Sequence, residues 1–364
     1  MTKKSWHSSS SLQFLEKYIN TPSPTGFEYT WQQVWLDFIK EYVDTTFIDT
    51  YGTAVGVINP EASYKVVIEA HADEISRFVN YIDDNGYLYV IRNGWSDHQI
   101  APSMRVNIWT KNWPITGIFW WPAIHVRRED KDPSIEVHNL SIDVGAKDKK
   151  EVEKMWIHVW SVITYQADFM TLNDRYYVWR ALDNRIGGYM ISQVAKKLSE
   201  DKKKLNFWLY IVNSVQEEIW LKGAEMIVQS IKPNISIITD VCHDTSTPLH
   251  MDKKKHGDTR CGLWPVLSYA PSIHNKLRDH IISIAQKKKI PFQRLANSRR
   301  TGTDTDAFAY ANGGTPSCLI SLPLKYMHTT VETVHKDDVE QTIDLMYQTL
   351  LHLDPKEDYK YIKL

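Results

Sequence analysis

The sequence predicts an α/β fold, in which a mainly parallel mixed sheet is flanked by helices and interrupted by a small inserted β-rich domain. Three observations support this prediction. Apolar runs of strand length alternate with helical patterns up to about residue 75, the alternation returns after about residue 180, and short strand-like pieces follow one another in between. Strands that alternate with helices indicate a parallel sheet covered on both faces, whereas many short strands indicate a barrel or a sandwich.

The first part of the chain is expected to form two amphipathic helices followed by two strands. Helical patterns cover 11–20 and 28–43, and the Pro- and Gly-containing loop TPSPTGFE separates them. Strand-like runs follow at 53–59 and 65–70. The second run is nearly all apolar, as expected for a strand buried on both faces, and it leads directly into the segment HADE at 71–74.

The middle of the chain consists of short strand-like pieces joined by turns, with no long helical period apart from a charged stretch at 147–155. This spacing predicts a small β-barrel or sandwich. We expect the main domain at 1–75 and 173–364, with the insert at 76–172. The expected strands of the insert are YLYVIRN, RVNIWT, ITGIF, LSIDVG and VITY.

After about residue 180, helices and strands alternate again and complete the parallel sheet. The expected helices are 185–198, 221–231, 276–289 and 336–353, and the expected strands are 206–215, 235–241 and 316–322. The last helix is amphipathic and closes the fold.

The composition is typical of a soluble globular protein. Hydrophobic residues make up 43% and charged residues 24%, which excludes a disordered or collagen-like chain. The 43 basic and 44 acidic residues nearly cancel, so no overall field favours nucleic acid or an anionic membrane. We expect neither a signal peptide nor a membrane-spanning helix. Three widely spaced cysteines, Cys242, Cys261 and Cys318, favour the reducing cytoplasm over a disulfide framework.

Side chains that commonly bind metal ions stand at the ends of several apolar runs. They are His71 with Asp73, Asp183, the pair Glu217-Glu218, Asp240 and His328. In open α/β sheets ligands bind at the carboxyl ends of the strands, so we expect these side chains to converge. Two histidines with three or four carboxylates suit a pair of divalent metal ions that share a bridging carboxylate and a bridging water. Zinc and cobalt both fit this set.

The adjacent acids Glu217 and Glu218 suit a division of roles. Two metal ions about 3.5–4 Å apart can hold a carbonyl and activate a water. A further carboxylate, not bound to metal, must take the proton from that water and pass it to the leaving amine. Neighbouring side chains diverge at a strand end, so one acid can bind metal while the other faces the substrate. Taken singly, most of these signals are more typical of a helix cap, a solvated helix start or a loop histidine, and Asp240 could equally well cap a loop, so only the ordered set carries the prediction.

These residues stand in motifs that resemble those of the tetrahedral aminopeptidases, a family of cytosolic dinuclear metallopeptidases that includes glutamyl and deblocking aminopeptidases. EAHADEIS resembles the family's first-ligand motif, ALDNRIGGY its bridging-Asp motif and VQEEIWLKGA its catalytic Glu-Glu motif. TDV at 239–241 and MHTTVE at 327–332 resemble its last two ligand motifs. NGWSDHQIAPS and LSIDVGAKDKKEVE are similar to segments of its inserted domain, and RTGTDTDAF to a segment near its active site, to which we assign no role.

The resemblance implies a zinc-peptidase-like fold that holds two divalent metal ions, zinc or cobalt. Asp183 would bridge the two ions. Glu218 and His328 would complete one site, and His71 and Asp240 would complete the other. The inserted domain would be a small β-barrel that serves for dimerisation.

The implied function is that of a metal-dependent aminopeptidase, which removes N-terminal residues from peptides. Glu217 would be the general base and acid, and Asp73 would lie behind His71 and Glu217 and orient these two side chains. Acidic groups near the metal ions would hold the free amine of the peptide. The family works as a hollow dodecamer built from dimers, so self-association is implied as well.

Two alternatives stay open beside this function. The chain could be an inactive homologue that serves as a structural or oligomeric scaffold. It could also be an endoglucanase-like glycoside hydrolase, since relatives have been labelled endoglucanases, although two carboxylates suffice for that chemistry and no cluster of five metal ligands is needed. The N-terminal residue that the enzyme prefers is left open.

The chain carries 14 Trp and 15 Gly, although glycine ordinarily makes up about 7% of a protein. The resembling family usually has Gly at about ten of the Trp positions: Trp31, Trp95, Trp113, Trp120, Trp156, Trp160, Trp179, Trp208, Trp220 and Trp264. Ten such replacements would overpack the fold at about 1–3 kcal/mol each. One hypothesis is that these positions are UGA codons that the source reads as glycine, as some uncultivated bacterial lineages do. The alternative is a family variant with an unusually aromatic core.

Overall fold

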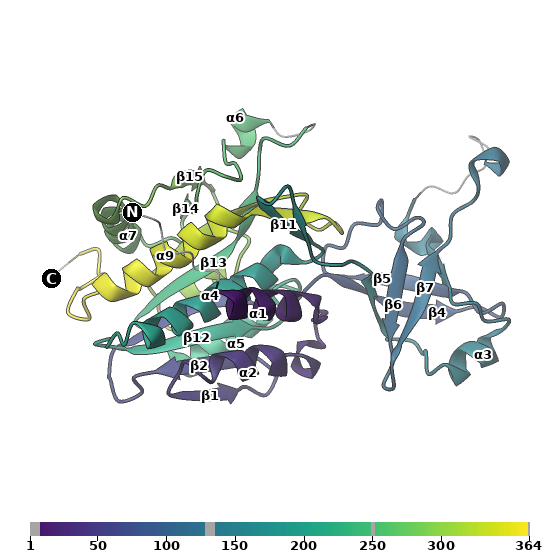
Figure 1. Cartoon of the computed structure of the whole chain (residues 1–364), viewed down its shortest axis with the longest axis horizontal. Coiled ribbons are helices and arrows are strands. Elements are labelled where there is room, and N and C mark those ends of the chain that lie inside the picture. Colours follow the sequence, from purple (N-terminus) through teal and green to yellow (C-terminus); the bar gives the residue numbers. More distant parts are fainter. Residues whose placement is uncertain (1–7, 128–134, 249–251, 363–364) are drawn as a thin grey trace.

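The computed structural model describes residues 8–127, 135–248 and 252–362, which form a large α/β body with a smaller β-barrel at one end (Figure 1). Residues 1–7, on which the expectation of no signal peptide partly rests, lie outside the described residues. Within the described part of the chain, no helix is both long and apolar enough to span a membrane.

An 11-stranded mixed sheet forms the centre of the large body. Its strands are β1 (Thr45–Ile48), β2 (Ala54–Ile58), β3 (Lys65–His71), β10 (Met170–Leu172), β11 (Tyr176–Trp179), β12 (Trp208–Ser214), β13 (Ile235–His243), β14 (Val266–Tyr269), β15 (Gln293–Ala296), β16 (Ser317–Lys325) and β17 (Glu332–His335). The main path runs β1-β2-β12-β3-β13-β16-β17-β11-β10. The four strands β12, β3, β13 and β16 are parallel, and antiparallel pairs continue the path on either side. The predicted α/β fold with a mixed sheet is thereby confirmed.

Helices cover both faces of this sheet (Figure 1). They are α1 (Ser9–Asn20), α2 (Gln33–Ile39), α4 (Leu182–Glu200), α5 (Lys222–Ile231), α6 (Lys253–His256), α7 (Asn275–Lys288), α8 (Thr305–Ala309) and α9 (Lys336–His352). Helix α4 packs on β3, β12 and β13, with α1, α2 and α9 beside it, whereas α5 packs on β12 and α8. The crossover from β3 to β12 runs one way along the sheet and the crossover from β12 to β13 runs the other way. Because such crossovers are right-handed, α4 and α5 lie on opposite faces.

The central strands are nearly continuous apolar runs because both of their faces are covered. All residues of β3 after Lys65 are buried, and all residues of β13 before His243 are buried. In the parallel pair of β3 and β12, His71 lies opposite Ser214, the last residue of β12. The segment that follows β12 therefore leaves the sheet at the same edge as the segment that follows β3.

Six antiparallel strands between Ser76 and Tyr165 close into a barrel, in the order β4-β5-β8-β7-β6-β9. The predicted inserted barrel is thus confirmed, and its interior is apolar, with Val90, Ile108 and Ile142 among its buried side chains.

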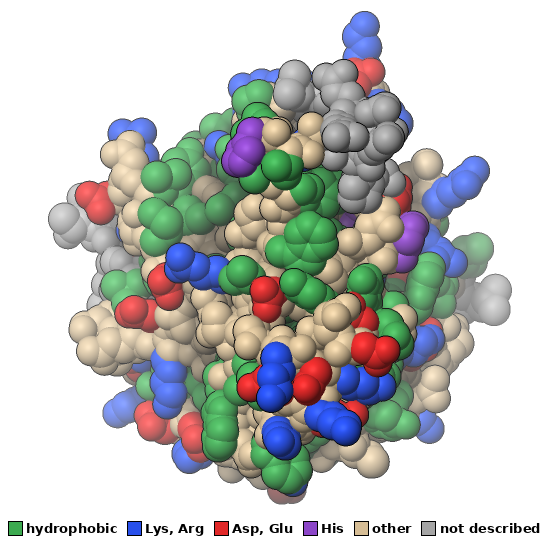
Figure 2. Space-filling view, turned by 90° about the vertical axis from the view of Figure 1, so that its right-hand side faces the viewer, with side chains coloured by type: hydrophobic (Ala, Val, Ile, Leu, Met, Phe, Trp, Pro, Cys, Tyr) green, Lys and Arg blue, Asp and Glu red, His purple; other side chains and the backbone are tan. Residues whose placement is uncertain are grey.

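Strands β10 and β11 follow the barrel in the chain, pair with each other and extend the large sheet at β17. The elements of the barrel are β4 (Ser76–Ile82), β5 (Leu88–Asn93), β6 (Arg105–Trp109), β7 (Pro114–Phe119), η2 (Ile124–Val126), η3 (Val137–Asn139), β8 (Ser141–Asp143), α3 (Lys149–Lys154) and β9 (Val162–Tyr165). Figure 2 views the molecule from this end, where apolar side chains lie among charged ones.

The helix expected at 28–43 is present in part, but it is shorter and interrupted. The chain forms a single 3-10 turn, η1 (Glu28–Thr30), then the short helix α2, and then the edge strand β1. Strand β1 has the sequence TTFI and pairs with β2. Its β-branched and aromatic residues favour a strand, and it begins just after the range that was expected to be helical.

Four tryptophans at the expected glycine positions have a left-handed backbone. Trp156, Trp160, Trp220 and Trp264 have φ angles of 64°, 81°, 81° and 72°. Glycine adopts this region freely, whereas it costs other residues about 1–2 kcal/mol. The overpacking expected from the sequence is absent at three of them, because the side chains of Trp156, Trp160 and Trp220 are exposed. The cost at these positions is therefore one of backbone conformation and not of crowding.

Candidate metal centre

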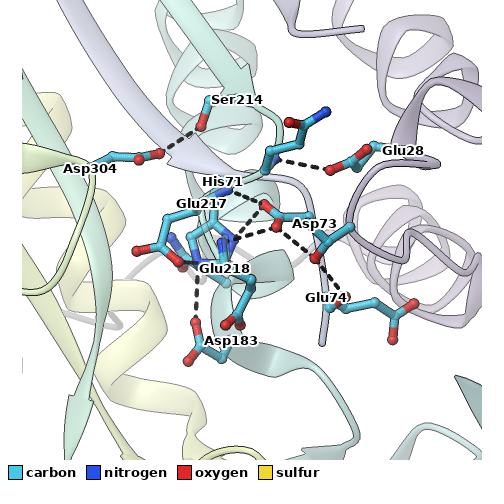
Figure 3. A network of polar contacts seen from close by, with 12 residues as sticks. Glu28, His71, Asp73, Glu74, Asp183, Ser214, Glu217, Glu218 and Asp304 are labelled. Carbon is cyan, nitrogen blue, oxygen red and sulfur yellow. Dashed lines mark hydrogen bonds and ion pairs between the residues drawn. The ribbon is translucent and has the colours of Figure 1, made fainter. Parts of the chain in front are cut away.

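The predicted ligands lie together at the carboxyl edge of the parallel strands. His71 is the last residue of β3, Asp240 lies near the end of β13, and Glu218 follows β12. Asp183 lies at the start of α4, and His328 follows β16. Figure 3 shows His71, Asp183 and Glu218 side by side, although they come from distant parts of the chain. Their convergence follows from the parallel strands, which all end at one edge of the sheet.

Asp183 lies between the two histidines. Its Oδ1 is 3.2 Å from Nε2 of His71, and its Oδ2 is 3.3 Å from Nε2 of His328. Asp240 Oδ1 is 3.8 Å from Nε2 of His71, and Glu218 Oε1 is 3.4 Å from Nε2 of His328. The possible ligand atoms of His71, Asp183 and Asp240 lie within 4.8 Å of one another, as do those of Asp183, Glu218 and His328. The geometry thus contains two ligand groups that share one carboxylate.

The centre gathers negative charge that its own side chains do not balance. Burial raises the pKa of Glu217, Glu218 and Asp240, and repulsion from neighbouring acids adds to the rise. Burial also favours the neutral form of Asp183, but hydrogen bonds with His328 and His71 outweigh it and hold the pKa of Asp183 well below its usual range. Clustered buried carboxylates are costly unless cations compensate them. The donor set of imidazoles and carboxylates therefore fits a pair of divalent metal ions.

Asp73 and Glu217 lie next to the two ligand groups that share Asp183, but neither acid is a member of them. Asp73 is fully buried, with Oδ1 at 3.3 Å from Nδ1 of His71. Glu217 Oε2 lies 3.8 Å from Nε2 of His71, on the side that faces the cavity. A third possible ligand group, which combines His71 with Glu217 and Glu218, overlaps the two described above. Asp73 is placed to orient a ligand from behind, and Glu217 is placed to meet a bound substrate or water.

A cavity of about 1060 Å³ opens over the centre. Its lining includes Asp183, Glu217, Glu218, Asp240 and His328. The lining also includes Trp95 and Trp220, whose side chains are exposed. Ligand pockets commonly measure about 300–1000 Å³, so this cavity has room for the end of a peptide.

Glu332 is a buried acid that was not singled out from the sequence, although it stands in the motif MHTTVE. Its Oε2 accepts the N–H of Asp183 at 2.9 Å, and its Oε1 accepts the N–H of His328 at 2.6 Å. One carboxyl group thereby fixes the backbones of two ligands. Burial raises the pKa of Glu332 to about 8, and the charge of Asp183 adds to the rise.

Glu69 and Asp304 form a second buried group that the sequence did not reveal. Both carboxyl groups contact the hydroxyl of Ser214. Figure 3 shows the contact with Asp304, which measures 2.8 Å. A hydroxyl has one proton, so Ser214 donates to one acid and the other contact requires a proton on the second acid. Burial raises the pKa of Glu69 well above its usual range. Two signals were available: Glu69 is a charged residue within the apolar part of the run KVVIEA, and Asp304 lies in the segment RTGTDTDAF, to which no role was assigned.

A comparison with protein families supports the assignment that the geometry suggests. The family model described as M42 glutamyl aminopeptidase matches residues 52–345, which is most of the chain. The chain belongs to the M42 glutamyl aminopeptidase family. It is therefore an aminopeptidase and a hydrolase, and it belongs to a family of metal-dependent peptidases, as its motifs predicted.

Individual relatives agree with this M42 membership. The lysyl aminopeptidase of Pyrococcus furiosus is 31% identical over 348 residues, which cover 95% of this chain and 98% of the relative. The structure of an aminopeptidase from the archaeon Desulfurococcus kamchatkensis is 29% identical, with a TM-score of 0.87 and 96% of both chains covered. The TET1 peptidase of Pyrococcus horikoshii is 26% identical, with a TM-score of 0.83 and 94% of this chain and 100% of that chain covered. The resemblance to the tetrahedral aminopeptidases is thereby confirmed.

Proposed function

We propose that this M42 peptidase is a dinuclear metallo-aminopeptidase that removes N-terminal residues from peptides. The observation that carries the proposal is the position of Asp183, which presents one oxygen to His71 and the other to His328, at 3.2 and 3.3 Å. Such a carboxylate is suited to bridge two divalent ions. In this proposal His71 and Asp240 complete one metal site, and Glu218 and His328 complete the other.

The side chains of the centre divide the work of hydrolysis. Two divalent ions, zinc or cobalt, would polarise the peptide carbonyl and acidify a water when bound. Glu217 faces the cavity and takes the proton from that water, then gives it to the amine that leaves. Asp73 holds His71 and the Glu217 backbone in place from behind. The surplus of carboxylates in the cavity attracts the free amine of the peptide, which makes the N-terminus the preferred end.

Metal content and chelator sensitivity test this proposal. The purified protein is expected to carry about two divalent ions per chain and to hydrolyse aminoacyl-p-nitroanilides. A chelator should abolish the activity, and added zinc or cobalt should restore it. Hydrolysis that persists unchanged after complete removal of metal would contradict the dinuclear mechanism.

Activity measurements with and without metal, on an aminoacyl-p-nitroanilide and on a glucan, separate the two alternatives. A scaffold without catalytic activity would bind metal and fail to turn over any aminoacyl-p-nitroanilide. A glycoside hydrolase would cleave a glucan and keep that activity after metal removal, because its chemistry needs only two carboxyl groups. The two ligand groups that share Asp183 support the peptidase over both alternatives.

Self-association is part of the proposed function. The P. horikoshii TET1 peptidase is described as assembling into a tetrahedron or a large octahedral shell. In this chain, Ile118, Trp120, Ile124 and Val126 expose apolar side chains on the barrel domain, which we propose as the dimerisation domain. We place the enzyme in the cytoplasm, in keeping with Cys242, Cys261 and Cys318, which are all free.

Light scattering after size-exclusion chromatography tests the assembly. The expected result is a dimer or a dodecamer built from dimers, with a surface of the barrel buried between chains. Charged replacements at Ile124 and Val126 should shift the population toward smaller species, because a buried charge at an apolar interface is costly. A monomer at all concentrations would contradict the proposal.

A further inference from the structure

We propose that Glu28 is a positioning residue, which holds the peptide of Gln216 and thereby sets the position of Glu217 in the cavity. The inference rests on the proposed function, in which Glu217 exchanges the proton of the attacking water. Glu28 lies in η1, at the end of the loop TPSPTGFE, and is 188 residues away from Gln216 in the sequence. Neither the motifs nor the metal ligands assign a role to this loop.

Two buried carboxylates hold three consecutive amides of the segment that carries the catalytic pair (Figure 3). Glu28 Oε1 accepts the N–H of Gln216 at 2.9 Å. Asp73 accepts the next two, from Glu217 at 3.0 Å and from Glu218 at 3.1 Å. Every backbone donor from Gln216 to Glu218 is therefore fixed by a carboxyl group.

Gln216 has a backbone conformation that needs such support. Its φ is 58°, in the left-handed region that residues other than glycine seldom adopt. A conformation of this kind persists only where surrounding contacts hold it. The carboxyl group of Glu28 accepts the N–H of Gln216, which directly precedes Glu217. Loss of this hydrogen bond would let the backbone of Gln216 relax and would turn the Glu217 side chain away from its position in the cavity.

The loop holds the second carboxylate as well. The hydroxyl of Thr25 donates to Asp73 Oδ2 at 2.9 Å, and the side-chain amide of Asn93 donates to the Thr25 carbonyl at 2.8 Å. Between Thr25 and Glu28 the chain turns at Gly26, whose φ is 86°. Glu28 itself is completely buried. The loop from the N-terminal part of the chain thus contacts the segments that follow β3 and β12 and holds them in position.

Replacement of Glu28 by Ala tests the role. We expect kcat to fall about 10–100-fold, the range seen when the partner that orients a catalytic or ligating group is lost. KM should change less than about twofold, and the bound metal should stay at the wild-type level, because Asp73 still holds Glu218. Glu28→Gln keeps an acceptor of the same shape and should retain most of kcat. Burial raises the pKa of Glu28 to about 8, with a contribution from Asp73, so the neutral amide is a close mimic.

Asp338 provides a matched control. It is a buried carboxyl group in α9 that accepts the N–H of Gly262 at 2.6 Å and the N–H of Trp264 at 2.7 Å, and it is not among the residues that line the cavity. Asp338→Ala should lower the Tm while kcat of the folded enzyme stays unchanged. Kinetic constants, metal content and Tm are measured for each variant.

The outcomes separate this inference from the proposed function. If wild-type enzyme is active and chelator-sensitive while Glu28→Ala keeps its kcat, Glu28 is not a positioning residue and the proposed function stands. If wild-type enzyme shows no metal-dependent turnover, the proposed function itself fails. Should Glu28→Ala not fold, Glu28→Asp keeps the carboxyl group but withdraws the acceptor by one methylene. Wild-type kcat in both Glu28→Asp and Glu28→Gln would overturn the inference.

Discussion

Replacement of Glu217 by Gln is expected to lower kcat by about 10²–10⁴-fold, the usual contribution of general acid–base catalysis. The amide has the shape of the carboxylate, but it cannot accept the proton of the attacking water. Glu217 faces the cavity and lies outside the two ligand groups that share Asp183, so the variant should keep about two metal ions per chain. Steady-state kinetics on an aminoacyl-p-nitroanilide and metal analysis of the same sample provide the measurement.

The neighbouring acid provides the control for this prediction. Glu218 Oε1 lies 3.4 Å from Nε2 of His328 within one ligand group. Glu218→Gln should therefore release metal and lose activity in proportion, and excess metal should restore part of the activity. If Glu217→Gln loses metal and Glu218→Gln keeps it, the roles of the pair are exchanged.

Replacement of Trp156, Trp160, Trp220 and Trp264 together by Gly is expected to stabilise the protein. Each of these residues has a left-handed backbone, with φ between 64° and 81°. Glycine removes a conformational cost of about 1 kcal/mol at each position, so the four replacements together add about 4 kcal/mol to the free energy of unfolding. In a chain of this size, that gain raises the Tm by roughly 8 °C. Thermal unfolding of the fourfold variant against the parent chain measures the effect. An unchanged or lowered Tm would show that these tryptophans are suited to their positions.

Two controls support the interpretation of the tryptophans. Trp35 is completely buried in α2 and donates Nε1–H to the carbonyl of Gly188 at 2.9 Å, so Trp35→Gly should destabilise the fold by about 3–5 kcal/mol. The gene supplies the second control. UGA codons at the four left-handed positions would support the hypothesis that the source reads them as glycine, whereas UGG codons would rule it out.

The side chains that we propose as metal ligands were predictable because each stands beside a feature that the sequence displays. His71 and Asp240 lie at the carboxyl ends of apolar runs, and the parallel arrangement of those runs follows from their alternation with helices. Once these strands are parallel, their ends meet at one edge. The position of the barrel was also predictable, because a series of short strands interrupts the α/β pattern.

The tryptophans show where this kind of prediction fails. Composition and motif position marked ten of the tryptophans as unusual. The sequence does not reveal the backbone φ angle or the burial of each one. Trp179 is buried in β11, with its Nε1–H donated to the carbonyl of Ala167 at 3.3 Å, whereas Trp220 is left-handed and exposed. The expected overpacking was wrong at Trp220 because its side chain points away from the packed interior. Only the folded chain distinguishes a core residue from a strained one.

The sequence by itself determined the α/β fold, the inserted barrel, the family and which residues gather at the candidate metal centre, because these depend on local periodicity and on strand ends. The tertiary structure decided which further groups hold that centre in place. Glu28 contacts Gln216 across 188 residues, and Glu332 contacts Asp183 across 149. Both acids bind backbone N–H groups, and every residue except proline carries one, so no side-chain pattern marks the partner. Such contacts exist only after the strands have paired and the loops have been buried.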